Sequence, residues 1–112
     1  MADIKQVNQI NFDYNGHHYT LEYNREAVKR MEAAGFKPGE SGSTPLIELD
    51  MLWAGAFYKN HRKESSRIIE ELLGKMKDKD KLLEALRNMV AETYNSLMDE
   101  GDEGNVEWTA TI

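Results

Sequence analysis

The sequence predicts a mostly helical α+β fold, in which an N-terminal β-hairpin precedes a small bundle of about four helices. Around an early Asn-Gly pair, apolar residues alternate with polar ones, which is typical of a hairpin with a two-residue turn. Farther along, apolar residues recur at the three- and four-residue spacing of amphipathic helices. The length suits one domain over residues 1–112, which we divide into a loose arm (1–8), a hairpin and helix (9–36), a loop (37–44), a helical bundle (45–98) and an acidic flexible tail (99–112).

The hairpin is the clearest local pattern. Asn15-Gly16 favours a type I′ turn, because both central residues of that turn take positive φ. The predicted strand pairs are Tyr14 with His17, Phe12 with Tyr19 and Ile10 with Leu21. The face that then carries the apolar side chains comprises Ile10, Phe12, Tyr14, Tyr19, Leu21 and Tyr23. Because a lone two-stranded hairpin is marginally stable in water, we expect this face to cover the helices.

A short helix is predicted directly after the hairpin. Asn24 suits its N-cap, and Gly35 suits its C-terminal end because glycine readily takes positive φ. The apolar stripe of this helix comprises Ala27, Val28, Met31 and Ala34. The residues up to 44 are rich in Gly and Ser and are interpreted as a loop.

The next predicted helix, from Pro45 to about Asn60, carries two apolar sectors. The first sector comprises Leu46, Leu49, Trp53, Ala56 and Phe57. The second lies roughly 120° away around the helix axis and comprises Ile47, Met51, Ala54 and Tyr58. Such a helix is either the centre of the bundle or packs on the core with one sector and on a partner with the other.

Two more amphipathic helices complete the predicted bundle. One begins near Ser65 or Ser66, and its apolar side comprises Ile68, Ile69, Leu72, Leu73 and Met76. The other runs from about Asp80 to Met98, and its apolar face comprises Leu82, Leu83, Leu86, Met89, Val90, Tyr94 and Leu97. The acidic residues within 99–107 are expected to be solvated and flexible.

Composition and motifs exclude several classes of function. The net charge of −6 disfavours general binding to nucleic acid or to an anionic membrane. The chain has no cysteine, and neither a membrane-spanning apolar run nor a signal peptide is expected. Phosphate-binding glycine motifs and the H-E-x-x-H zinc motif are absent from the sequence. We therefore expect no cofactor, no metal, no catalytic residues and no enzymatic activity.

Three other groups of residues could suggest a binding site, but a structural or solvent-exposed role is expected for each. His17 and His18 point to opposite faces of a strand, and His61 has only Glu64 at ligand spacing, so structural or surface roles are expected. Gly101 stands where a calcium loop needs an oxygen ligand, so the acidic segment is not a calcium site. A solvated helix corner is expected for the basic group Lys59, Arg62, Lys63 and Arg67.

Five short sequences follow one another in a telling order: INFDYNG (10–16), YTLEY (19–23), NREAV (24–28), MEAAGF (31–36) and LDMLWAGAF (49–57), ahead of a basic corner and two helices. This order, over residues 9–98, resembles the small tail assembly chaperones of long-tailed bacteriophages and prophages, particularly those of Gram-positive hosts. The resemblance implies a non-enzymatic protein of the host cell cytoplasm. It implies binding to the tape measure protein, which is kept soluble until the tail tube protein polymerises around it.

Partner binding is predicted for the second sector of the long helix, with one further residue in the tail: Ile47, Met51, Ala54, Tyr58 and Trp108. The spacing of the helical residues suits contact with a partner helix or with a second copy of the chain. Two other functions fit the same composition. One is a small prophage adaptor or regulator that binds a host or phage protein, and the other is a minor structural subunit of the tail.

Overall fold

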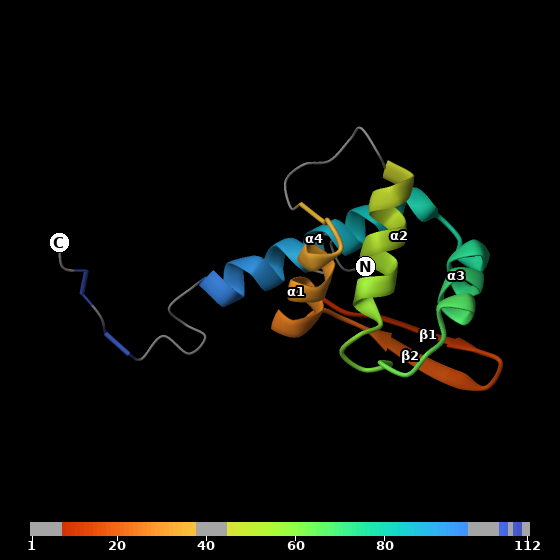
Figure 1. Ribbon diagram of the computed structural model, residues 1–112. Helices are drawn as coiled ribbons and strands as arrows, with labels where there is room; N and C mark the ends of the chain where they lie inside the picture. Colours follow the sequence, from red (N-terminus) through yellow and green to blue (C-terminus); the bar gives the residue numbers. More distant parts are fainter. Residues whose placement is uncertain (1–7, 38–44, 99–105, 108, 111–112) are drawn as a thin grey trace.

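The described part of the chain begins with a two-stranded antiparallel sheet and continues with four helices, which confirms the predicted mostly helical α+β fold. The computed structural model describes residues 8–37, 45–98, 106–107 and 109–110. Its elements are β1 (Ile10–Tyr14), β2 (His17–Leu21), α1 (Arg25–Ala33), α2 (Pro45–Ala56), α3 (Ser66–Lys75) and α4 (Lys79–Met98). Figure 1 shows α4 crossing behind α1 and α2, with the hairpin below α2 and α3.

The hairpin has the predicted register, in which Tyr14 pairs with His17 and Phe12 with Tyr19. Asn15 has φ 50° and Gly16 has φ 79°, so both turn residues take the positive φ of a type I′ turn. The apolar face packs on α2, where the Phe12 ring stacks on Trp53 with centroids 5.9 Å apart. The prediction that this face covers the helices is therefore confirmed.

Helix α1 ends in a Schellman motif that buries a residue beyond the helix. The Gly35 amide donates to the Glu32 carbonyl and the Phe36 amide to the Met31 carbonyl, with Gly35 at φ 105°. This reversal carries the Phe36 side chain into the core and leaves Ala34 exposed. The prediction that Ala34 belongs to the buried stripe was wrong, because the stripe ends where the helical geometry ends. The N-cap was predicted correctly, since Asn24 Oδ1 accepts the Ala27 amide at 2.8 Å.

Helix α2 ends at Ala56, earlier than the predicted end near Asn60. The Ala56 carbonyl accepts the Glu22 amide at 3.2 Å, and the side-chain amide of Asn60 donates to the Thr20 carbonyl at 3.1 Å. The next residues turn tightly, because the Tyr58 amide donates to the Gly55 carbonyl three residues earlier. After Ala56 the chain is therefore held by hydrogen bonds to the hairpin and does not form the last predicted helical turn, although the apolar spacing of the sequence continues.

Helix α2 is the central helix, since it packs on α1, α3 and α4 as well as on the hairpin. Leu52 is fully buried although neither predicted sector includes it, because neighbours surround α2 on more than one side. Leu46 was assigned to the buried sector, but it is 77% exposed at the first turn. The core of α2 comprises Leu49, Leu52, Trp53 and Ala56, and Phe57 follows in the turn.

Helices α3 and α4 follow the prediction closely. Ser65 caps α3, where its Oγ accepts the Ile68 amide at 3.3 Å, and Asp78 at φ 53° turns the chain into α4. Ala85 of α4 is also buried, outside the predicted stripe. Of the helices in the described part of the chain, none combines the length and apolar character that crossing a bilayer requires. The predicted arm, loop and tail lie almost wholly outside the described residues, as do Gly101 and Trp108.

Candidate functional site

The second apolar sector of α2 remains open on the outer side of the bundle. Ile47 is 60% exposed, Ala54 is exposed, and Met51 and Tyr58 are half-buried at the edge of the core. Helices α3 and α4 therefore do not cover the sector. The prediction that α2 is the centre of the bundle is confirmed, and this sector remains accessible, so its packing on a partner stays a prediction.

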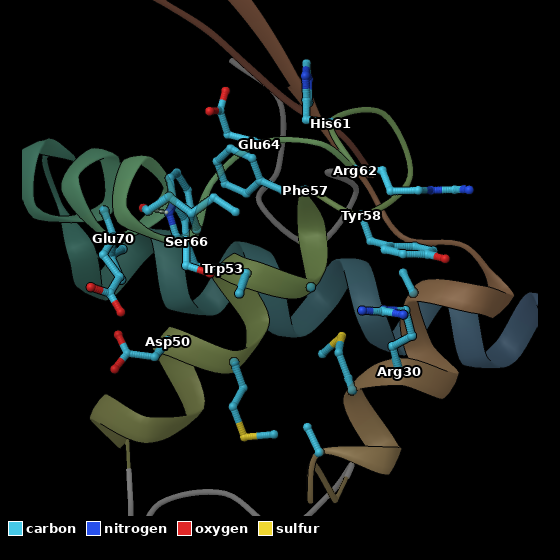
Figure 2. A pocket seen from close by; sticks show the side chains of 18 residues that line it. Arg30, Asp50, Trp53, Phe57, Tyr58, His61, Arg62, Glu64, Ser66 and Glu70 are labelled. Carbon is cyan, nitrogen blue, oxygen red and sulfur yellow. Dashed lines mark hydrogen bonds between the residues drawn. The ribbon is translucent and has the colours of Figure 1, made fainter.

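Met51, Ala54 and Tyr58 lie together on the floor of a groove of about 560 Å³. One wall of this groove is α1 and the other is α3, while the turn after α2 closes its upper end in Figure 2. Ile47 is not among the lining residues and lies beyond the groove at the start of α2. The structure thus brings together three of the four predicted residues of the sector.

Gly55 allows α1 to approach α2 closely at the groove. A Cβ atom added there would lie 2.7 Å from Met31 Cγ and closer still to Met31 Sδ. Met31 is only 4% exposed, so it has little freedom to move away. The absence of a side chain at Gly55 therefore leaves the space that the Met31 side chain occupies between α1 and α2.

Tyr58 is stacked between two arginines at one end of the groove. The guanidinium carbons of Arg30 and Arg62 each lie 4.6 Å from the centroid of the Tyr58 ring. Figure 2 shows the two side chains on opposite sides of the ring. A tyrosine face attracts a guanidinium through its negative quadrupole, so each arginine is held in place while its donors stay accessible.

The predicted basic corner is exposed at all four positions, as expected, but two of its side chains have specific contacts. Lys59 Nζ lies 2.7 Å from Glu22 Oε1 and fixes the turn to the hairpin, whereas Arg62 stacks on Tyr58. The Glu22 carboxylate accepts from Lys59 and from Gln9, which lowers its pKa to about 2. Lys63 and Arg67 are exposed, as expected for a solvated corner.

Two carboxylates lie at the other end of the groove. Asp50 of α2 and Glu70 of α3 both line it, and Figure 2 shows their carboxylates pointing toward one another. Sequence reasoning selected neither these residues nor Arg30. No local pattern marks them, since each is an ordinary polar residue on an exposed helix face and only the packing brings them around α2.

The polar residues at the upper end of the groove support the fold. His61 Nε2 accepts the Thr20 amide at 3.0 Å, and its ring packs against Tyr19 with centroids 5.0 Å apart. Glu64 accepts from the Tyr19 hydroxyl at 3.1 Å. Burial, and then this hydrogen bond, raise the pKa of Tyr19. His61 therefore has the structural role that the sequence predicted.

The other two histidines lie at the turn end of the hairpin. His18 Nδ1 is 2.8 Å from Asp13 Oδ1 in an exposed pair, and His17 is exposed beside Tyr19. Among the residues that the structure describes, no three His, Asp or Glu side chains come close enough to hold a metal ion.

Comparison with known proteins places the chain in one family. Neither a curated protein nor a solved structure matches it. A family model, described as a domain of unknown function, matches residues 1–112, which is the whole chain. The chain therefore belongs to the family DUF5055.

Proposed function

We propose that this protein acts by binding, without catalysis, and that its groove holds an amphipathic helix of a partner protein. The observation that carries the proposal is the partly exposed apolar floor formed by Met51, Ala54 and Tyr58 between two helical walls. A groove of this kind receives helices through apolar anchors spaced three and four residues apart.

The composition of the floor suits a partner with a repetitive apolar stripe. Ala54 is small and leaves room for a bulky side chain above α2, while Met51 is flexible and adapts to different shapes. Burial of an exposed apolar side chain contributes about 1–2 kcal/mol. A few such contacts give moderate affinity at each site, which suits a chaperone that must later release its partner.

The titratable side chains at the upper end of the groove support a binding function over catalysis. His61 already uses Nε2 to accept a backbone amide, and Glu64 already accepts from Tyr19 and from the Ser65 amide. A general base must reach a substrate proton or a nucleophile with an available atom. These two side chains are better suited to hold the turn against the hairpin.

The proposed partner is the tape measure protein of a phage tail, and the proposed setting is the host cell cytoplasm. This identification rests on the resemblance over residues 9–98 to tail assembly chaperones. The groove adds a physical requirement that a long helical chain meets, because such a chain offers many apolar stripes to successive copies of the chaperone.

Co-expression with a long helical tape measure protein of a phage tail tests the proposal. We expect the partner to be soluble and to co-purify with the wild type. The Met51→Ser/Tyr58→Ser variant should fold but capture much less partner. The matched control is Leu46→Ser/Met98→Ser, which removes two exposed apolar side chains outside the groove.

Three outcomes contradict the proposal. Equal capture by the groove variant and the control would place binding elsewhere. Loss of fold in the groove variant, measured by circular dichroism, would show that the sector is core. Recovery of the protein as a stable component of purified virions would indicate a structural subunit instead of a chaperone.

A further inference from the structure

The two ends of the groove carry opposite charges. Arg30 and Arg62 lie at the end marked by Tyr58, and Asp50 and Glu70 lie at the other end. The floor between these ends is apolar. A helix lying in the groove would therefore meet positive charge at one end of its contact and negative charge at the other.

The arginine end is organised to receive a carboxylate. Among the described residues, Arg87 pairs with Glu48, whereas neither Arg30 nor Arg62 forms an ion pair. Both guanidiniums are held against the Tyr58 ring, so they lose little additional freedom when a partner binds. The planar guanidinium matches a carboxylate in a bidentate geometry, which a lysine does not.

The acidic end favours a cation. The carboxylates of Asp50 and Glu70 point toward one another, and like charges in such an arrangement repel. A lysine or arginine between them relieves the repulsion. From Asp50 to the end of α2 at Ala56 the helix rises about 9 Å, and Tyr58 lies in the turn just beyond, so the two ends are roughly two turns of a partner helix apart.

We infer that the groove selects an amphipathic helix that carries an acidic side chain and a basic side chain about two turns apart, at the edges of its apolar stripe. The acidic side chain lies at Arg30 and Arg62, and the basic one lies at Asp50 and Glu70. This arrangement fixes the direction of the partner helix along the groove. The inference rests on the proposed function and specifies the chemistry of the partner.

A second copy of this chain is a less suitable occupant. The chain carries a net charge of −6, so two copies repel each other over a distance. We take the occupant to be a different chain, whose stripe is flanked by both signs of charge, and dimerisation of this chain is an outcome of the test below.

Four synthetic helical peptides test the inference on the full-length protein. They share one apolar stripe and differ only at two flanking positions two turns apart, which carry Glu and Lys, Glu and Glu, Lys and Lys, or Gln and Gln. Affinities are measured by fluorescence anisotropy at low and high salt. We expect the Glu/Lys peptide to bind about fivefold tighter than the Gln/Gln peptide at low salt, with the difference shrinking at high salt.

Charge reversal at the arginine end supplies the matched comparison. In the Arg30→Glu/Arg62→Glu variant, we expect the Lys/Lys peptide to bind tightest. Lys29→Glu/Lys63→Glu changes the net charge equally at exposed neighbouring positions outside the groove, and it should keep the wild-type preference. Circular dichroism verifies that both variants fold.

The possible failures are distinguishable. If all four peptides bind equally but Met51→Ser/Tyr58→Ser abolishes their binding, the inference is overturned and the proposed function stands. If peptides bind and the Met51→Ser/Tyr58→Ser variant binds them unchanged, both are overturned. If no peptide binds, the inference fails and co-expression with the partner decides the function. Groove-dependent dimerisation in analytical ultracentrifugation would favour a second copy and overturn the inference.

Discussion

Gly55 and Gly74 form a matched pair that tests the close packing beneath the groove. Each is the penultimate residue of its helix, Gly55 in α2 and Gly74 in α3. A Cβ at Gly74 would meet nothing within 4 Å, whereas a Cβ at Gly55 would press on the buried Met31 side chain. Alanine at the two positions thus has the same effect on backbone freedom but a different effect on packing.

The expected free energies of unfolding follow from this geometry. Alanine in place of a helical glycine stabilises by about 0.5–1 kcal/mol, so Gly74→Ala should be more stable than the wild type. Gly55→Ala gains the same amount, but overpacking against Met31 costs about 1–3 kcal/mol. We therefore expect Gly55→Ala to be less stable than Gly74→Ala by about 1–3 kcal/mol, or several degrees in Tm.

Urea denaturation followed by circular dichroism measures both variants, and the Met31→Ala background isolates the cause. Met31→Ala should itself cost about 2–5 kcal/mol, because it leaves a cavity at a buried position. In that background the new methyl group enters the cavity, so Gly55→Ala should become stabilising. Equal stabilisation by Gly55→Ala and Gly74→Ala in the wild-type background would refute the argument that Met31 restricts this position.

Three other predictions concern the hairpin and its attachment. Gly16→Val should lower the free energy of unfolding by about 1–2 kcal/mol, because a β-branched residue resists positive φ, and Gly16→Asn should lose less; equal urea midpoints would contradict this. Because the folded state holds the pKa of Glu22 at about 2, below its ordinary 4.5, its stabilising effect is present above pH 4.5 and is lost as the pH falls toward 2. Over that pH range, the free energy of unfolding of Glu22→Gln, measured by urea denaturation at each pH, should therefore fall by about 1–2 kcal/mol less than that of the wild type. His61→Phe keeps an aromatic ring but leaves the Thr20 amide without its acceptor, which should cost about 1–2 kcal/mol; an unchanged melting temperature would show that water replaces the ring nitrogen.

The sequence by itself determined the features that depend on neighbouring residues. The turn at Asn15-Gly16, the Asn24 and Ser65 caps and the stripe of α4 all follow from local backbone preferences and from helical or strand periodicity. The second apolar sector of α2 could also be predicted, because the spacing of apolar residues around a helix depends only on the sequence of that helix. Three residues of that sector do line the groove.

Only the tertiary structure decided where those local rules stop and what surrounds the groove. Helix α2 ends at Ala56, where the Glu22 amide after the hairpin donates to the Ala56 carbonyl, and Ala34 is exposed because the Schellman motif turns Phe36 inward instead. The arginines at Tyr58 come from α1 and from the turn after α2, and the carboxylates at the other end come from α2 and α3. These arrangements of residues from different helices depend on how the helices cross and pack. The periodicity within one segment carries no information about the angle or depth of that packing.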